Sequence, residues 1–514
     1  MDHHHVVVLG GFVHIEAALI MKILPDLHIL ILGLGDSGLA MVRWCELQGA
    51  KVTVVDTREH PPGLDSLRAE GLSATFIHGD FHAELLEDQT IQGVFKSPGL
   101  TPTQVQAVWH AAKQKGIWLG TELSLFAHAL SHLAKEHAYH PRVIAITGTN
   151  GKTTVTALTT LLLQRAGLSV AMAGNIGPTV LDTLSQCLPE LPQAWVLELS
   201  SFQLDAEDSF EPTAACVLNL TQDHLDWHAD MASYGLAKSR VYGLQAIAVM
   251  PRHDEAVRAL LPKNSIKKKS VQRQIISFGN DMPDQAGDYG LEQINGMKWL
   301  VRVNASETEG KRKVEESLQI QRLMPADALR LRGQHNAVNA LAALALASTC
   351  GAGMAAMLHA LREYRGEPHR MQSVGVVNDI EYVNDSKGTN VAATLAALGS
   401  LGTDKNLVVI LGGEGKAQDF TPLLKPLKQF ARAVVLIGKD APLIEKVLSG
   451  VAFPVLHASD MASAVTKAQE QAQTADTVLL SPACSSLDMF KNYEERGYVF
   501  GECVNALVFE KGHA

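Results

Sequence analysis

The chain carries Ile144-Ala-Ile-Thr-Gly-Thr-Asn-Gly-Lys-Thr-Thr154, in which an apolar strand runs directly into a glycine turn, a lysine and two hydroxyls at a helix start. This order is typical of a loop that holds a nucleoside triphosphate. Gly148 and Gly151 let backbone N–H groups approach the phosphates, and the following helix adds its positive N-terminal dipole. Lys152 reaches the β- and γ-phosphates, and Thr153 can bind Mg²⁺. The loop therefore predicts ATP chemistry.

The loop is shorter than the common G-x-x-x-x-G-K-[ST] pattern. Ile146 occupies the place of the first glycine, and Gly148 stands three residues before Gly151. A lone G-K-T can be an ordinary turn. The apolar strand before it and the helical run at Val155–Arg165 argue against that alternative.

Length and composition narrow the class of protein. At 514 residues the chain is too long for one hydrophobic core, and about three domains are expected. It has 44 basic and 54 acidic residues, a formal charge of −10, which disfavours nucleic-acid binding. Six singly placed cysteines favour a cytoplasmic protein. The apolar run Val6–Met21 is too short to span a membrane and lacks the features of a signal peptide, so we expect no membrane insertion.

Strand-like and helical runs alternate along the chain, which predicts an α/β fold with parallel sheets in three domains. Early strands are predicted at His28–Leu32, Lys51–Val55 and Gly93–Lys96, and later ones at Ala194–Leu199, Ala214–Leu220, Leu407–Leu411, Ala433–Ile437 and Thr477–Leu480. The predicted segments are an N-terminal extension (1–23), a Rossmann-like N-terminal domain (24–130), a central P-loop ATPase-like parallel-sheet domain (131–366) and a C-terminal Rossmann-like α/β domain (367–514).

Three details of this organisation are also expectations. The run His3–His5 is interpreted as disordered rather than metal-binding. The polar segment 131–141 separates the first two domains, and Gly366 and Pro368 mark a hinge-like linker. The charged segment Lys263–Met324 is expected to form short strands and exposed loops peripheral to the central sheet.

A second glycine-rich turn, Gly33-Leu-Gly-Asp-Ser-Gly38, follows a strand and opens a helix, and Asp56 ends the next strand. This is the fingerprint of NAD-binding domains. The pattern itself requires only a diphosphate at a helix N-terminus, so a nucleotide-sugar diphosphate satisfies it equally. A tight turn without a ligand is the third alternative.

Polar groups also follow several predicted strands, where ligands of parallel sheets gather. Glu198 ends one strand, and Asp223, His224 and Asp226 follow another. Each alone would be a cap or a solvated turn, but together with the phosphate loop they favour a cation site. In the third domain Ser481–Asp488 can receive a carboxylate at a helix start. Cys484 is interpreted as a buried structural thiol rather than a nucleophile.

In this order the residues resemble the Mur ligase family of ATP-dependent amide synthetases, over roughly residues 24–510. Three stretches resemble the D-glutamate-adding branch, namely Asn384–Asn390, Gly412–Lys416 and Ser481–Gly497. The resemblance implies addition of D-glutamate to UDP-N-acetylmuramoyl-L-alanine through an acyl phosphate. It also implies a cytoplasmic monomer that makes peptidoglycan precursors for cell-wall growth, cell shape and cell division.

The resemblance further implies the site residues. ATP would be bound by Gly148, Thr149, Asn150, Gly151, Lys152, Thr153, Thr154, Asn339, Arg370 and Asp385. The UDP-substrate would be bound in the N-terminal domain and by one central residue, that is by Gly35, Asp36, Ser37, Asp56, Thr57, Arg58, Ser97, Pro98, Gly99 and Asn175. D-Glutamate would be bound in the C-terminal domain by Lys387, Thr389, Lys416, Ser486, Leu487 and Tyr493. Two Mg²⁺ ions would be held by Thr153, Glu198, His224 and a carbamylated Lys238, and the catalytic residues would be Lys152, Glu198, His224 and Lys238.

Three other functions stay open. A nicotinamide dehydrogenase would use Gly33–Gly38 but leave the phosphate loop idle. A regulatory NTPase would hydrolyse ATP without a small acceptor. A folylpolyglutamate synthetase shares the short T-G-T-N-G-K-T loop, but the stretch Ser481–Gly497 and the glycine-rich turn at Gly33–Gly38 disfavour it.

Overall fold

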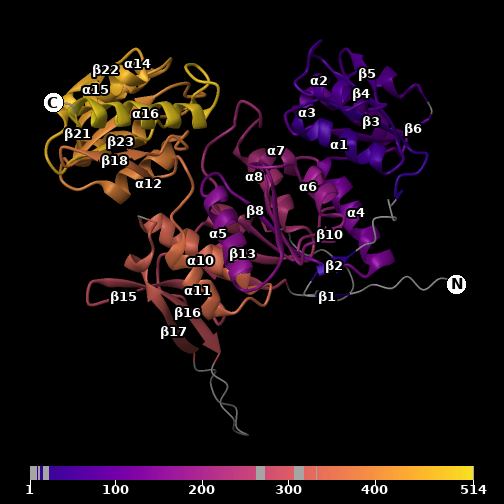
Figure 1. The fold of residues 1–514 in the computed structure, drawn as a ribbon, viewed down its shortest axis with the longest axis horizontal. Coiled ribbons are helices and arrows are strands. Elements are labelled where there is room, and N and C mark those ends of the chain that lie inside the picture. The colour runs from indigo at the N-terminus through magenta and orange to yellow at the C-terminus, as the bar shows by residue number, and fades with distance from the viewer. Residues whose placement is uncertain are drawn as a thin grey trace, which may run out of the picture.

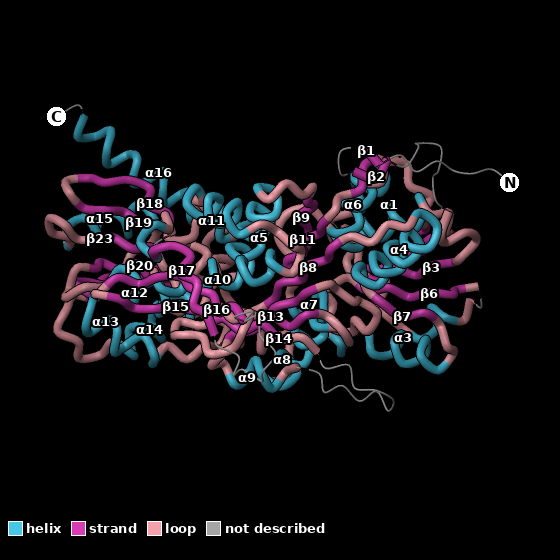
Figure 2. Tube along the Cα trace, turned by 90° about the horizontal axis from the view of Figure 1, so that it is seen from below, coloured by secondary structure: helices cyan, strands magenta, loops and turns pink. Residues whose placement is uncertain are grey.

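The computed structural model describes residues 8–9, 12–14, 22–88, 90–261, 273–305, 318–331 and 333–512. Three α/β units lie in a row, with the N-terminal and C-terminal units on opposite sides of the central one (Figures 1 and 2). Of the predicted N-terminal extension, strand β1 (Val8–Leu9) pairs with β2 (Phe12–His14), and β2 pairs with β10 (Glu190–Leu191), in a small antiparallel sheet. The His3–His5 run lies outside the described residues.

The N-terminal unit is a five-stranded parallel sheet in the order β5-β4-β3-β6-β7. This confirms the Rossmann-like prediction. Helix α4 runs on through part of the segment predicted as a polar separator, because its buried face continues to Leu133. The elements are β3 (His28–Leu32), α1 (Asp36–Leu47), β4 (Lys51–Asp56), α2 (Leu64–Ala69), β5 (Thr75–His78), η1 (Ala83–Leu86), β6 (Ile91–Lys96), α3 (Pro102–Gln114), β7 (Trp118–Gly120) and α4 (Glu122–His137).

The central unit is a nine-stranded sheet in the order β17-β16-β15-β14-β13-β12-β8-β11-β9. Neighbours from β9 to β15 pair in parallel, as predicted. Its strands are β8 (Arg142–Thr147), β9 (Val170–Gly174), β11 (Ala194–Glu198), β12 (Ala214–Val217), β13 (Ile247–Pro251), β14 (Ile275–Phe278), β15 (Tyr289–Ile294), β16 (Met297–Ala305) and β17 (Leu318–Pro325). Its helices are α5 (Lys152–Arg165), α6 (Val180–Cys187), α7 (Ser201–Leu204), α8 (Met231–Ser239), η2 (Arg240–Tyr242), α9 (Glu255–Ala259), η3 (Ala326–Ala328), α10 (Gln334–Ser348) and α11 (Met354–Glu363).

The expectation for Lys263–Met324 was wrong where the structure describes this segment. Strand β14 continues the central sheet, and β15, β16 and β17 extend it as an antiparallel edge rather than lying apart from it. The nine-residue strand β16 is not short. It buries Leu300 and Val301 despite the polar residues around them.

The C-terminal unit is a six-stranded sheet in the order β18-β19-β23-β20-β21-β22, parallel except for the β18–β19 pair. The predicted α/β domain is confirmed. Its elements are β18 (Gln372–Val377), β19 (Ile380–Asn384), α12 (Val391–Leu401), β20 (Leu407–Gly412), η4 (Thr421–Leu423), α13 (Leu424–Phe430), β21 (Ala431–Ile437), α14 (Ala441–Val447), β22 (Val455–His457), α15 (Met461–Gln471), β23 (Thr477–Leu480) and α16 (Tyr493–Gly512). Among the described residues, no helix combines the length and apolar character needed to cross a membrane.

The two junctions between the units differ in kind. One continuous hydrophobic core joins the N-terminal sheet to a face of the central sheet through α1, α4 and α6. Within it, Trp195 stacks edge-on against Phe126 with ring centroids 5.1 Å apart, and its Nε1 donates to the Tyr139 hydroxyl at 2.9 Å. The C-terminal unit instead has two cores of its own. The first junction is therefore built like a domain interior.

A buried carboxylate at this first junction predicts a pH effect on stability. Glu122 is 3% exposed and accepts a hydrogen bond from Leu181 N at the start of α6. Burial raises the pKa of the Glu122 carboxyl to about 7, so the folded state holds a proton that the unfolded chain releases above about pH 4.5. Its stabilising contribution is present at low pH and is lost as the pH rises to about 7.

Glu122→Gln removes this titration. We compare the free energy of unfolding of the wild type with that of the variant at each pH. Relative to the variant, the wild type should lose up to about 3 kcal/mol between pH 4.5 and pH 8. Urea denaturation at both pH values measures it. Glu255→Gln, at an exposed carboxylate, is the control. Parallel pH profiles of the wild type and Glu122→Gln would contradict the assignment.

Candidate functional site

The phosphate loop lies between β8 and α5. Gly148 and Gly151 have φ of 147° and 84°, backbone conformations that favour glycine. A Cβ at Gly151 would also stand only 3.0 Å from Asn339 Oδ1. Lys152 Nζ lies back over the loop and donates to Gly148 O at 2.9 Å and Thr149 O at 3.0 Å. The lysine charge is therefore held where an incoming phosphate would meet it.

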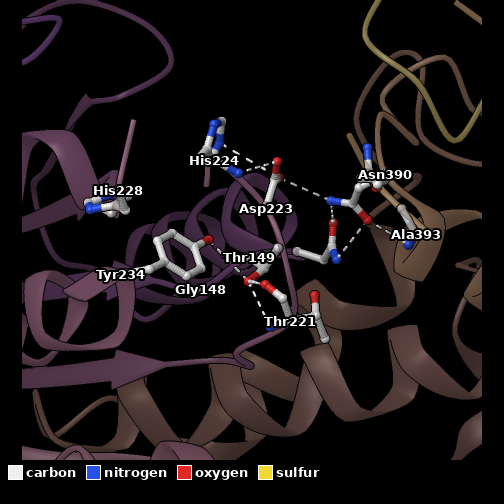
Figure 3. A network of polar contacts seen from close by, with 12 residues as sticks. Gly148, Thr149, Thr221, Asp223, His224, His228, Tyr234, Asn390 and Ala393 are labelled. Atoms are coloured by element: carbon white, nitrogen blue, oxygen red, sulfur yellow. Dashed lines mark hydrogen bonds and ion pairs between the residues drawn. The ribbon is translucent and has the colours of Figure 1, made fainter. Parts of the chain in front are cut away.

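The loop is anchored by the segment that follows β12 (Figure 3). Thr149 Oγ1 donates to Thr221 O at 3.1 Å and lies 3.1 Å from the Tyr234 hydroxyl. Asn150 N donates to Asn219 Oδ1 at 2.9 Å, and Asn219 Nδ2 donates back to Asn150 O at 3.0 Å. These hydrogen bonds fix the conformation of the loop through contacts with the segment that follows β12.

Lys238, on α8, is buried beneath this loop. Its side chain is 2% exposed, and Nζ donates to Gly148 O at 3.1 Å and approaches Thr147 Oγ1 at 3.4 Å. Nζ also lies 4.6 Å from the centre of the Tyr234 ring. Within the described part of the chain, no carboxylate lies within ion-pair distance of it. Burial, and then the charge of Lys152, lower the pKa of Lys238 well below its ordinary value. Burial therefore favours the neutral, nucleophilic form of this amine more than it is favoured in an exposed lysine.

Glu198 and His224 face the same space from two strand ends. Glu198 closes β11, is 2% exposed and accepts a hydrogen bond from Asn175 Nδ2 at 3.1 Å. The His224 ring packs edge-on against Phe202 at 4.8 Å, and its Nε2 lies 3.7 Å from Asp223 Oδ2. Burial lowers the pKa of His224, which favours its neutral imidazole form.

These donors suit a magnesium ion shared with phosphates. Among the described residues, no three His, Cys, Asp or Glu side chains converge into a complete metal cage. Mg²⁺ is commonly bound through one or two carboxylates, substrate phosphates and water. The Glu198 carboxylate and the Thr153 hydroxyl, both at the phosphate loop, fit this pattern.

Residues of the C-terminal unit complete the site across the second junction. Arg370 Nη2 donates to Thr153 Oγ1 at 3.0 Å. Asp385 accepts from Ser481 Oγ at 2.8 Å and from Met371 N at 3.2 Å. Burial raises the pKa of Asp385 to about 7.

Two adjoining cavities hold most of the predicted residues. One, of about 260 Å³, is lined by the predicted ATP-binding residues Asn150, Gly151, Thr154, Asn339, Arg370 and Asp385. The other, of about 240 Å³, is lined by the predicted metal and substrate residues Lys152, Thr153, Asn175, Glu198, His224, Lys238, Lys387 and Thr389. The structure thus brings residues predicted to bind ATP, metal and acceptor together from two units, around two adjoining cavities.

The predicted UDP-substrate residues other than Asn175 form a separate group at the carboxyl ends of β3, β4 and β6. Asp56 accepts from Leu34 N and from Arg58 Nη2, each at 2.7 Å. Ser97 Oγ donates to Gly33 O at 2.9 Å. The remaining members lie in the same three turns and at the start of α1, namely Gly35, Asp36, Ser37, Thr57, Pro98 and Gly99. None of this group lines the two cavities.

The other predicted D-glutamate residues lie in neighbouring loops of the C-terminal unit. The loops of Lys416 and Ser486 are joined where Glu414 N donates to Ser485 O at 3.0 Å. Lys387 Nζ lies 3.6 Å from the centre of the Tyr493 ring, and burial lowers the pKa of Lys387 to about 7. Neither cavity is lined by Lys416, Ser486, Leu487 or Tyr493.

The buried-thiol interpretation of Cys484 agrees with the structure. The side chain is fully buried. Burial raises the pKa of its thiol to about 12, so a reactive thiolate is strongly disfavoured.

The sequence did not single out three residues that lie at the site. Tyr234 stands four positions before Lys238 on α8, so helical spacing was the signal that could have found it. Trp227 Nε1 donates to Gly99 O at 3.4 Å and links the N-terminal group to the His224 loop. Asn390 reaches the phosphate loop from α12, and no local pattern predicts that contact.

Comparison with known proteins finds three family models along the chain. It matches the models of the Mur ligase MurD-like N-terminal domain over residues 27–119, the Mur ligase middle domain over 146–347 and the Mur ligase glutamate ligase domain over 369–484. It is 55% identical to the UDP-N-acetylmuramoylalanine–D-glutamate ligase of Albidiferax ferrireducens, over 96% of this chain and 99% of that protein. A Polaromonas protein of the same name is 48% identical, over 96% and 100%.

A solved structure shows the same fold at low sequence identity. It is that of a MurF ligase from Thermotoga maritima in complex with ADP. It matches with a TM-score of 0.55 and 15% identity, over 94% of this chain and 96% of that one.

Proposed function

The chain belongs to the Mur ligase family, and from this premise we propose that it is the ATP-dependent ligase that joins D-glutamate to UDP-N-acetylmuramoyl-L-alanine in peptidoglycan precursor synthesis. One observation carries the proposal. The phosphate loop, the buried Lys238 and Glu198 share one cavity with Lys387 and Thr389 of the C-terminal unit. A nucleotide and a second reactant can therefore meet between the two units.

The chemistry requires activation because a carboxylate oxygen is a poor leaving group. An oxygen of the L-alanyl carboxylate attacks the γ-phosphorus, the bond to the β–γ bridging oxygen breaks, and ADP leaves with an acyl phosphate formed. The D-glutamate amine then attacks the acyl carbon, phosphate leaves, and the nitrogen loses a proton. Holding amine and acyl phosphate in contact is worth effective molarities on the order of 10⁵ M.

The predicted site residues take the following roles in this scheme. Lys152 offsets the charge of the reacting anions, as phosphate-clamping lysines do. Thr153, Glu198, His224 and Lys238 would hold two magnesium ions. When bound, magnesium neutralises phosphate charge as a Lewis acid. Arg370, Asn339 and Asp385 surround the nucleotide, and Thr389, Lys387, Lys416, Ser486, Leu487 and Tyr493 receive D-glutamate.

Lys238 would serve as a carbamate. Its neutral amine attacks carbon dioxide and the nitrogen loses a proton, which leaves an anionic carbamate on the side chain. The lack of a described carboxylate partner and the direction of its pKa shift support this assignment. A carbamate oxygen is a suitable ligand for magnesium.

The N-terminal group would bind the UDP end of the substrate, so Gly33–Gly38 would hold a nucleotide-sugar diphosphate rather than NAD. We assign the UDP-substrate domain to 24–130, the ATP domain to 131–366 and the D-glutamate domain to 367–514. We further propose a monomer that works in the cytoplasm and supports cell division and cell shape. Its six free cysteines fit a reducing compartment.

Phosphate release tests the function. With Mg·ATP and UDP-N-acetylmuramoyl-L-alanine, we expect release only when D-glutamate is added, together with an amide product in the mass spectrum. L-Glutamate is the matched control because it differs only in stereochemistry. Release with neither amino acid would overturn the proposal, and release without any acceptor would favour a simple NTPase.

Domain closure gives a second prediction. The N-terminal and central units share one core, whereas the C-terminal unit follows the linker at Gly366–Pro368, so we expect it to move as a body. Closure excludes water from the acyl phosphate. Small-angle scattering should show a smaller radius of gyration with an ATP analogue and the UDP-substrate than with D-glutamate alone. An unchanged profile would count against closure.

A further inference from the structure

Asn390, the residue that begins α12, touches two catalytic loops of the central unit. Its Nδ2 donates to Asn150 Oδ1 at 3.2 Å and to Asp223 Oδ2 at 3.3 Å. Asn150 Nδ2 donates in return to Asn390 Oδ1 at 3.3 Å. Figure 3 shows Asn390 and Asp223 facing each other between the units. One side chain of the C-terminal unit therefore contacts both the tip of the phosphate loop and the neighbour of His224.

The orientation of this amide is determined by its surroundings. Asn390 Oδ1 also accepts from Ala393 N at 2.9 Å, as the N-cap of α12. Its Nδ2 faces the Asp223 carboxylate, which only accepts hydrogen bonds when ionised. If the amide oxygen and nitrogen were exchanged, the nitrogen would face the donors Ala393 N and Asn150 Nδ2. The oxygen would face the acceptors Asn150 Oδ1 and Asp223 Oδ2. The cap thus aims the amide nitrogen across the junction.

Capping alone does not explain the residue. An N-cap needs only an acceptor oxygen, and Asp460 fulfils that role on α15 of the same unit by accepting from Ser463 N at 2.7 Å. Asn390 is 3% exposed, so its NH₂ group must find partners. Both of its partners belong to the other unit.

We propose that Asn390 is a positioning residue, through which the docked C-terminal unit holds the tip of the phosphate loop and the Asp223 side of the metal loop in their reactive arrangement. The inference rests on the proposed function. The inference deepens that function because it names the contact through which docking of the C-terminal unit acts on the nucleotide site. Asn390 itself touches neither reacting atom.

The consequence is a coupling between two binding events. Thr389, the neighbouring residue, is assigned to D-glutamate, and Asn150 is assigned to ATP. When the C-terminal unit docks, the two residues before α12 act together. Thr389 reaches the acceptor position, and the Asn390 amide reaches Asn150. Nucleotide affinity and the rate of the chemical step should therefore depend on the Asn390 amide, which lines the shared cavity but is assigned to neither substrate.

Asn390→Asp is the decisive variant. Aspartate keeps an acceptor for Ala393 N, so α12 stays capped. It loses the NH₂ donor and places a second carboxylate beside Asp223. We expect ADP affinity, measured by calorimetry, to fall about tenfold, kcat to fall about tenfold or more, and the melting temperature to stay close to that of the wild type.

Ser400→Ala is the matched control. Ser400 Oγ lies 3.0 Å from His335 Nδ1, across the same junction and on the same helix. Its removal deletes one neutral contact between the units without touching the phosphate loop. We expect ADP affinity to change less than twofold.

Asn150→Ala tests the same contact from the other side, and stays informative if Asn390→Asp misfolds. In the double variant, the loss in ADP affinity should be smaller than the product of the single losses, because one contact is removed twice. Multiplicative losses, or an Asn390→Asp variant that matches Ser400→Ala, would overturn the proposal. ADP affinity needs no acceptor, so a wild type inactive with D-glutamate would refute the function and leave this test intact.

Discussion

We expect Lys238→Ala to abolish turnover, with kcat falling by at least about 10²-fold. Lys238 is buried under the phosphate loop, with neutral hydrogen-bond partners at Thr147 and Gly148. As a carbamate it would supply an anionic metal ligand. Alanine removes that ligand and leaves the metal with fewer protein oxygens. Steady-state phosphate release with both substrates measures the effect.

The rescue pattern separates a lost metal ligand from a lost fold. Bicarbonate, a small acid that can bridge the metal, should partly restore the activity of Lys238→Ala, and chloride should not. Leu236→Ala is the control, because Leu236 is 60% exposed on the same helix and its loss should leave kcat near that of the wild type. Full activity in Lys238→Ala would end the carbamate proposal.

We expect the second large effect from Lys152→Ala, with kcat/KM for ATP falling by about 10³-fold. Nζ lies within 3.0 Å of two loop carbonyls, so it is placed before any phosphate arrives. Its charge stabilises the transferring phosphoryl group most in the transition state. Steady-state kinetics and ADP calorimetry together separate the loss of binding from the loss of rate.

Two variants control for this experiment. Arg165→Ala lies in the last turn of the same helix, where it pairs with Glu363 at the surface, and should leave the kinetics unchanged. Lys152→Arg keeps the charge with a different shape and should recover little activity. ATP kinetics of Lys152→Ala close to those of the wild type would place the phosphates elsewhere.

Local patterns were sufficient for much of the fold. Strands β3 and β23 have the predicted bounds, because short apolar runs between turn residues carry their own signal. The phosphate loop could be located for the same reason, since glycine, lysine and threonine at fixed spacing specify a backbone path. The polar residues at strand ends could be grouped because parallel strands end at one edge.

Local sequence patterns did not predict the structure where strand pairing at a sheet edge decides it. Strands β15 to β17 carry charged residues and alternate only weakly, so their apolar content indicated short strands and loops outside the central sheet. They form strands because each pairs with an existing edge of the central sheet, and strand preference depends on such partners. Helix α4 likewise extends beyond the predicted boundary because its buried face has a partner in the central unit.

The sequence by itself determined the phosphate loop, the strand-end carboxylate and the alternation of strands and helices, because each is encoded within a few neighbouring residues. Only the tertiary structure decided which of them meet. It buried Lys238 away from any described carboxylate, joined the first two units through one core, and placed Asn390 beside Asn150, 240 positions away in the chain. Contacts at that separation are set by how whole units pack, and no local pattern records them.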